Sequence, residues 1–129
     1  MILVDSSVWI AHLRGHETDA TAKLRSATQA AQVLVGDLIL LEILQGARDD
    51  EHAFRIERAL RQFPLVPLLS GDLAPLAAAH DRTLRRLGLT IRKTADLIIG
   101  TYCIERRHAL LHDDRDFDAM HQHLGLAVA

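Results

Sequence analysis

The chain has 129 residues, of which 49% are hydrophobic and 25% charged, and its formal net charge is −2. This composition is typical of one globular domain with a buried core, and it excludes an overall positive field that would attract nucleic acid. The single cysteine, Cys103, excludes an intramolecular disulfide. The start of the chain lacks the basic segment of a signal peptide, and no apolar run is long enough to cross a membrane. We therefore expect a soluble, cytoplasmic protein.

The first half of the chain is expected to alternate short strands with helices. Ile2–Val4 is an apolar, partly β-branched run that stops at Asp5, which predicts a buried strand. Ser6 or Ser7 can cap the helix that follows. The next predicted elements are a helix over 18–31, a strand over 33–35, a helix capped by Asp37 and running to 47, and a helix from 49 or 50 that ends before Pro64. Phe54, Ile56, Leu60 and Phe63 form the apolar face of the last of these helices.

The second half continues the same alternation. A short strand is predicted over 65–69, where Pro67 indicates a sheet edge or a strand end. The remaining predicted elements are a helix from 70 or 72 to 88, a helix capped by Thr94 and running to 107, a strand over 109–112, a short helix over 117–123 and a final strand over 126–128. This order predicts an α/β fold with a mostly parallel sheet, in a single domain over residues 1–129.

Acidic residues follow two of the predicted strands. Asp5 comes directly after the first strand, and Asp113, Asp114 and Asp116 come after the strand over 109–112. In open α/β sheets, ligands bind outside the carboxyl ends of the strands, so both groups of acids can share one rim. The alternative is that these acids lie at solvated strand ends and cap helices, and for Asp5 alone the two interpretations are about equally plausible.

Two further acids lie within predicted helices. Glu42 is surrounded by apolar residues in Leu38–Leu44, and a buried carboxylate is costly unless it is paired or binds a metal. We therefore favour a polar pocket over a solvent-facing stripe for Glu42. Asp96 lies in the first turn of its helix, where a favourable interaction with the helix dipole would explain it on its own. Gly100, one turn further along, would let another backbone pack close to this helix.

The combination of these acids carries the functional interpretation. Two carboxylates about 4 Å apart repel by roughly 4 kcal/mol at an effective dielectric constant of 20, so a cluster needs protons or cations. Mg²⁺ and Mn²⁺ prefer oxygen ligands and suit such a cluster. A set of carboxylates without cysteine argues against a structural zinc site.

Four segments resemble the VapC-type PIN-domain ribonuclease toxins of toxin–antitoxin pairs. They occur in the family's order and together span nearly the whole chain. The matching segments are Ile2–Ile10 around Asp5, Leu41–Gly46 around Glu42, Lys93–Gly100 around Asp96, and Leu110–Phe117 around Asp114 and Asp116. The resemblance implies a three-layer PIN-like fold.

The resemblance also implies an activity and a set of site residues. It implies a Mg²⁺-dependent endoribonuclease, with Mn²⁺ as a substitute, that a cognate antitoxin inhibits at its acidic site and that forms a homodimer. The acidic quartet that carries over as metal ligands is Asp5, Glu42, Asp96 and Asp114, and Asp116 is a supporting or alternative fourth acid. The hydroxyl of Ser6 could hold a metal-bound water or cap the helix. Such a site hydrolyses RNA phosphodiesters with an activated water, leaving 5′-phosphate and 3′-hydroxyl ends.

Three other functions are compatible with parts of the pattern. A phosphoacceptor signalling domain also places acids at strand ends and binds Mg²⁺. Such a domain needs an acid pair after the first strand, where this chain has only Asp5, and it also needs a lysine after a late strand. A DNA nuclease of the same fold would use the same acids, because the mechanism does not need the 2′-hydroxyl. A non-catalytic RNA- or protein-binding module would not need the complete acidic set. Arg82, Arg85, Arg86 and Lys93 could contact RNA phosphates or simply form a solvated helix face.

Overall fold

The computed structural model describes residues 1–129 and contains one parallel four-stranded sheet. The order of the strands across the sheet is β3-β2-β1-β4. The strands are β1 (Ile2–Val4), β2 (Val33–Gly36), β3 (Leu65–Val66) and β4 (Ala109–Leu111). Short apolar strands of this kind are expected where helices cover both faces of a parallel sheet.

Seven α-helices and one short 3₁₀ helix connect and cover the strands. They are α1 (Ser6–Leu13), α2 (Asp19–Gln29), α3 (Asp37–Gln45), α4 (Asp50–Leu60), α5 (Leu73–Arg86), α6 (Thr94–Arg106), η1 (Arg115–Phe117) and α7 (Asp118–Leu124). The predicted α/β class with a mostly parallel sheet is confirmed. None of the helices is long and apolar enough to span a bilayer.

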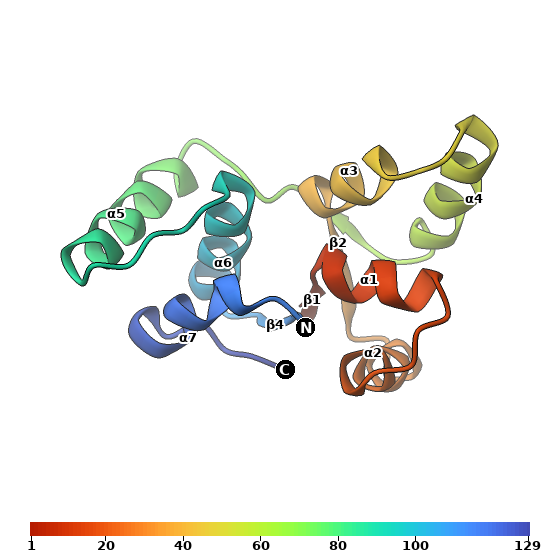
Figure 1. Ribbon diagram of the computed structural model, residues 1–129, viewed down its shortest axis with the longest axis horizontal. Helices are drawn as coiled ribbons and strands as arrows, with labels where there is room; N and C mark the ends of the chain where they lie inside the picture. The colour runs from red at the N-terminus through yellow and green to blue at the C-terminus, as the bar shows by residue number, and fades with distance from the viewer.

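The direction of the chain across the sheet reverses at β1. From β1 the chain passes to β2 and then to β3 on one side, and only later crosses to β4 on the other side of β1. In Figure 1, α1 to α4 lie to the right of the strands and α5 to α7 to the left, so that the sheet separates two groups of helices. The reversal lies between β1 and β4, and open α/β sheets bind their ligands outside the carboxyl ends of the strands at such a point.

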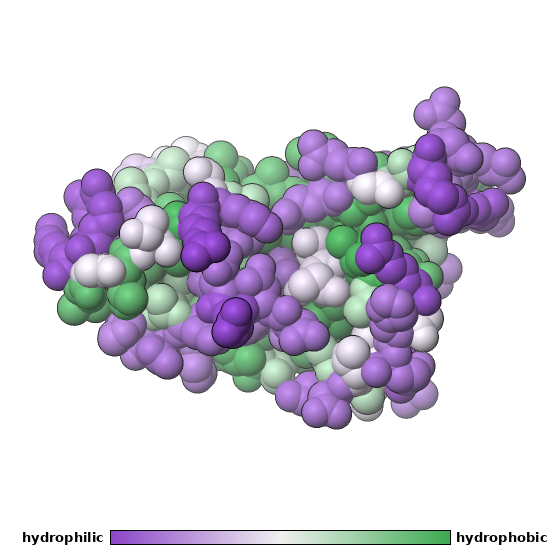
Figure 2. Space-filling view, viewed as in Figure 1, coloured by the Kyte–Doolittle hydropathy of each residue, from purple (hydrophilic) through white to green (hydrophobic).

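The core lies between the sheet and both helix groups. Leu3 on β1 is fully buried and pairs with Leu34 on β2 and with Leu110 on β4. Phe117 and Met120, which follow β4, are also fully buried, and so the segment after β4 is held against the rest of the protein. Hydrophilic residues dominate the face drawn in Figure 2, most densely over α4.

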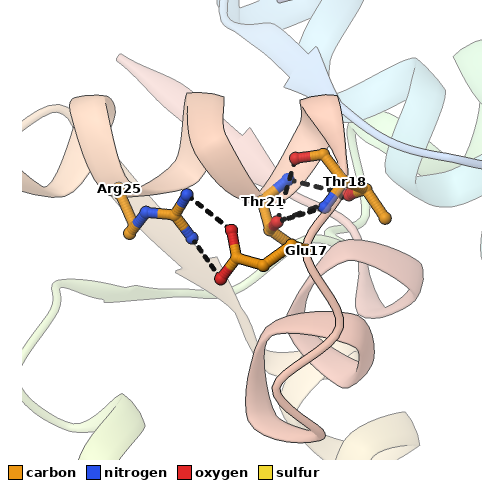
Figure 3. A network of polar contacts seen from close by, with 4 residues as sticks. All are labelled: Glu17, Thr18, Thr21 and Arg25. Atoms are coloured by element: carbon orange, nitrogen blue, oxygen red, sulfur yellow. Dashed lines mark hydrogen bonds and ion pairs between the residues drawn. The ribbon is translucent and has the colours of Figure 1, made fainter.

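Helix α2 begins with a reciprocal cap. The Thr18 hydroxyl accepts a hydrogen bond from the Thr21 backbone N–H at 3.1 Å, and the Thr21 hydroxyl accepts one from the Thr18 N–H at 2.9 Å. Figure 3 shows this pair beside the Arg25–Glu17 ion pair, whose shortest nitrogen–oxygen distance is 2.8 Å. The cap satisfies backbone donors that have no partner within the helix, and so fixes the start of α2 at Asp19.

Three helix caps differ from the predictions. Asp5, and neither Ser6 nor Ser7, is the N-cap of α1, because its carboxylate already accepts the backbone N–H of Ser7. Asp37 and Thr94 are each the first residue of their helix instead of the cap. Asp37 instead accepts the N–H groups of Leu38 and Leu68 at Oδ1, and so ties the start of α3 to the segment after β3.

Two packing predictions, at Phe54 and Gly100, were wrong, and one predicted strand is shorter than expected. Phe54, assigned to the apolar face of α4, is 63% exposed, because it lies two positions from Ile56 and so on a different side of the helix from the buried Ile56 and Leu60. The final strand over 126–128 is reduced to one parallel bridge between Leu110 and Val128. At Gly100, the group that packs close is the Met120 side chain from α7, and no backbone from another element.

Candidate active site

Asp5 lies where β1 ends and α1 begins. Its side chain is almost fully buried, with 3% of the residue exposed. Oδ2 accepts two hydrogen bonds from Ser7, one from the backbone N–H at 3.1 Å and one from the hydroxyl at 2.6 Å. The carboxylate at the end of β1 is therefore held in one orientation by the first turn of the next helix.

The segment after β4 brings two further carboxylates to the same rim. Asp114 is the N-cap of η1, and its Oδ1 accepts the backbone N–H of Asp116 at 2.9 Å. The Asp114 N–H in turn donates to Nδ1 of His112 at 3.2 Å, and the His112 ring lies against Phe117 with 5.0 Å between ring centres. These contacts hold Asp114 and Asp116 on a tight turn anchored by the buried Phe117.

Helices α3 and α6 supply Glu42 and Asp96. Asp96 lies in the first turn of α6 and is 3% exposed, whereas Glu42 lies in the middle of α3 and is half-buried. Each has one buried carboxylate oxygen without a hydrogen-bond partner, Oε1 of Glu42 and Oδ2 of Asp96. Buried polar atoms are nearly always paired in folded proteins, and a cation bound at this rim would give both oxygens a partner.

Three of these acids form a tight group. Asp96, Asp114 and Asp116 each offer a carboxylate oxygen, and these oxygens lie within 4.8 Å of one another. Burial, together with the negative charges of Asp5 and Asp114, raises the pKa of Asp96 to about 6. Because the charge of Asp5 contributes to the raised pKa of Asp96, Asp5 belongs to the same electrostatic cluster as the three acids.

Glu42 belongs to the same cluster electrostatically. Burial raises the pKa of Glu42 above its ordinary value, and the charges of Asp5 and Asp96 add to this effect. Lys93, at the N-cap of α6, acts in the opposite direction and lowers the pKa of both Glu42 and Asp96. The rim therefore carries five mutually repelling acids and one nearby ammonium group.

The donor set suits a hard divalent cation. All the donors are carboxylate oxygens, which Mg²⁺ and Mn²⁺ prefer, and the only cysteine is buried with a pKa raised to about 12. A cation bound by Asp96, Asp114 and Asp116 would offset the repulsion among them and could give the two orphaned oxygens a partner. The arrangement can thus bind a metal and, through it, a phosphate group.

The contacts of Asp113, Ser6 and Ser7 near the rim could not be predicted from the sequence. The Asp113 side chain is exposed and lies outside the group of three acids, while its backbone N–H donates to the Ser7 hydroxyl at 3.1 Å. Ser6 makes no side-chain hydrogen bond, and the hydroxyl engaged with the site is that of Ser7. Sequence reasoning considered Ser7 only as a helix cap, because its second partner is 106 residues away along the chain.

Curated relatives align with the whole chain. A VapC ribonuclease of Mycobacterium bovis and the ribonuclease VapC11 of Mycobacterium tuberculosis are each 30% identical to it over 131 aligned positions. Each alignment covers 100% of this chain and 98% of the relative.

Solved structures share the fold at lower sequence identity. A chain in the crystal structure of VapBC2 from Rickettsia felis, bound to a promoter DNA fragment, superposes with a TM-score of 0.79 at 15% identity and covers 100% of this chain and 98% of that one. A chain in the DNA-bound VapBC structure from Salmonella typhimurium gives a TM-score of 0.72 at 13% identity, with coverage of 99% and 96%. These superpositions extend the likeness to the whole α/β fold.

The sequence model of the PIN domain matches residues 2–122, from β1 into α7. Together with the full-length relatives, this match establishes that the chain belongs to the PIN domain family.

Proposed function

We propose that this protein is a metal-dependent endoribonuclease that acts as the toxin of a toxin–antitoxin pair. The observation that carries the proposal is the group formed by Asp96, Asp114 and Asp116, whose oxygens lie within 4.8 Å of one another beside a second orphaned carboxylate oxygen on Glu42. The full-length relatives that are named VapC ribonucleases support RNA as the substrate.

In this proposal, each acid has a role that follows from its position. Asp96, Asp114 and Asp116 bind the cation with their clustered oxygens, and Asp5, whose charge acts on Asp96, adds a further ligand from the end of β1. Glu42, with one free buried oxygen, orients a water molecule or shares the cation. A bound Mg²⁺ or Mn²⁺ supplies a lowered pKa for the attacking water and offsets charge on the phosphate. The products are a 5′-phosphate and a 3′-hydroxyl end.

RNA needs positive contacts that the net charge of −2 does not provide. Lys93 lies beside the acids, as its effect on the pKa of Glu42 and Asp96 indicates. Three exposed arginines near the end of α5, Arg82, Arg85 and Arg86, line one surface hollow, and only Arg85 is in an ion pair, with Asp81 at 3.4 Å. We propose that Lys93 and these arginines contact RNA phosphates.

We further propose a cognate antitoxin as the regulatory partner and a homodimer as the assembly. The structural neighbours described above are VapBC complexes, and a further one is described as a toxin–antitoxin complex from Klebsiella pneumoniae, which supports an antitoxin. A cationic side chain of the antitoxin placed among the acids would neutralise the rim and compete with the metal. The homodimer follows from the family resemblance, and light scattering of the purified protein tests it.

The experiment is cleavage of a structured RNA pool by wild type and by Asp96→Asn, each with Mg²⁺, Mn²⁺ or EDTA, and with DNA of the same sequence in parallel. The proposal requires cleavage by wild type alone that depends on metal, leaves 5′-phosphates and spares DNA. Cleavage that persists in EDTA and in Asp96→Asn would rule out the metal site. Cleavage of DNA at a similar rate would replace the ribonuclease by a general nuclease.

A further inference from the structure

Ser7 makes three polar contacts that together connect the ends of two strands. Its backbone N–H and its hydroxyl both lie against Oδ2 of Asp5, at 3.1 and 2.6 Å. Its hydroxyl oxygen also lies 3.1 Å from the backbone nitrogen of Asp113. Asp5 follows β1 and Asp113 follows β4, and these two strands are neighbours in the sheet.

The directions of these hydrogen bonds follow from the donors available. The Asp113 backbone N–H can only donate, so the Ser7 oxygen accepts there. The single hydroxyl proton of Ser7 then points to Asp5, whose carboxylate can only accept when it is ionised. Oδ2 of Asp5 thus receives two donors, and Oδ1 receives none from a side chain or from the start of α1.

Helix capping alone explains only part of this arrangement. An N-cap carboxylate needs one backbone N–H, and the Ser7 N–H provides it whatever side chain stands at this position. The hydroxyl adds a second, shorter bond to the same oxygen, and it holds the backbone immediately before Asp114. Asp114 is one of the three clustered acids, so the hydroxyl ties its turn to Asp5, in addition to the hydrogen bond from the Asp5 N–H to the Leu111 carbonyl at 2.9 Å.

We propose that Ser7 is the positioning residue of this site. Its hydroxyl occupies Oδ2 of Asp5 so that Oδ1 alone is offered to the cation, and it sets the distance from Asp5 to the turn that carries Asp114 and Asp116. The inference rests on the proposed function in that it assumes a divalent cation at this rim. Ser7 itself touches neither the cation nor the RNA.

The test measures Mn²⁺ affinity by isothermal titration calorimetry on the full-length chain, alongside RNA cleavage. The variants are Ser7→Ala, which removes the hydroxyl, and Ser7→Thr, which retains it. The control is Ser26→Ala, which removes a hydroxyl from the exposed side of α2, where the Ser26 side chain makes no hydrogen bond. Thermal unfolding in EDTA reports the stability of each variant without metal.

We expect Ser7→Ala to weaken Mn²⁺ binding by about 10-fold, as is typical when a group that orients a metal ligand is removed. We expect kcat to fall by a similar factor with little change in KM, and we expect Ser7→Thr to restore both values. Ser26→Ala should match wild type in both assays.

The inference and the proposed function fail in different ways. If Ser7→Ala lowers the unfolding temperature but binds Mn²⁺ as wild type does, Ser7 has a structural role only and the inference is overturned. If Ser7→Thr remains as weak as Ser7→Ala, the hydroxyl is not the cause. A wild-type protein that binds Mn²⁺ but cuts no RNA overturns the proposed function alone, and one that binds no Mn²⁺ overturns both.

Discussion

Asp114 holds Asp116 in place, because Oδ1 of Asp114 accepts the backbone N–H of Asp116 at 2.9 Å while both carboxylates remain in one group with Asp96. The two acids therefore belong to one turn, and both offer an oxygen to the group that includes Asp96. Asp114 combines two tasks, a negative charge at the rim and a cap for η1. Substitutions can separate these tasks.

Asp114→Asn keeps an oxygen that can cap η1 but removes the charge, whereas Asp114→Ala removes both. We expect both variants to lose at least about 10-fold in Mn²⁺ affinity and in RNA cleavage, with the larger loss in Asp114→Ala, because Asp116 is then released as well. Asp116→Asn should also lose cleavage. Asp113→Asn is the control, since its side chain is exposed and only its backbone contacts Ser7. Equal activity of Asp114→Asn and wild type would remove Asp114 from the site.

Divalent metal is expected to stabilise the folded protein. Binding to the folded state alone adds about 2.7 kcal/mol when the free metal is at 100 times its Kd, which is roughly 10 °C in Tm for a domain of this size. We expect this rise with Mn²⁺ in differential scanning fluorimetry, its reversal by EDTA, and most of it to be lost in Asp5→Asn. Asp113→Asn should keep the full shift. An equal rise in Asp5→Asn would place the stabilising metal elsewhere.

The sequence predicted which strand ends carry acids but not how these acids are held. That Asp5 and the acids after β4 share a rim followed from the alternation of strands and helices, because parallel strands end on the same side of the sheet. The spacing of Asp114 and Asp116 left their roles open, since residues two apart on a tight turn can face the same way or diverge. The structure shows that both face Asp96, because a carboxylate oxygen from each of the three residues lies within 4.8 Å of the others.

The contacts that sequence reasoning missed are those between distant segments. Ser7 meets Asp113 across 106 residues, and Asp37 meets Leu68 across 31, and neither contact leaves a periodic pattern. Phe54 was assigned to the core because its spacing fits a helical face, yet tertiary packing left it exposed. Local patterns thus set the elements, whereas the partners of single side chains depend on how these elements meet.

Gly100 is expected to be preferred over alanine, although it lies inside a helix. A Cβ at this position would overlap Sδ and Cε of Met120, so this fully buried side chain would have to shift. Alanine would add up to about 1 kcal/mol of helix propensity, but overpacking typically costs about 1–3 kcal/mol. We expect Gly100→Ala to lower the free energy of unfolding, as measured with urea.

Gly46→Ala provides the matched control for this change. Its Cβ would meet only the Ile43 carbonyl oxygen at 3.5 Å, an ordinary contact at the end of α3. We expect this variant to be as stable as wild type or slightly more stable. If Gly100→Ala were also neutral, α7 would be free to move away from α6, and the turn that carries Asp114 and Asp116 would be less firmly held than the packing of Met120 indicates.

The pKa of Asp96 makes the stability of the metal-free protein depend on pH in an unusual direction. Because the folded protein raises this pKa from 3.8 to about 6, the folded state binds more protons than the unfolded state between these two values. The free energy of unfolding contributed by Asp96 therefore falls as the pH rises through this range, and stays low above it. A carboxylate in a favourable ion pair would give the opposite slope.

Asp96→Asn should abolish this contribution. In EDTA at about pH 7, we expect the variant to be more stable than wild type by on the order of 2–3 kcal/mol, since one pKa unit corresponds to about 1.4 kcal/mol. The difference should shrink towards zero near pH 4, where Asp96 is protonated in the folded state, and urea titrations of both proteins across this range measure it.

With saturating Mn²⁺ at pH 7 the order of stability should reverse, because wild type gains metal binding and Asp96→Asn does not. A wild type that is already the more stable protein in EDTA would mean that Asp96 is held by a favourable partner within the fold, and that its unpaired oxygen does not reflect a metal site.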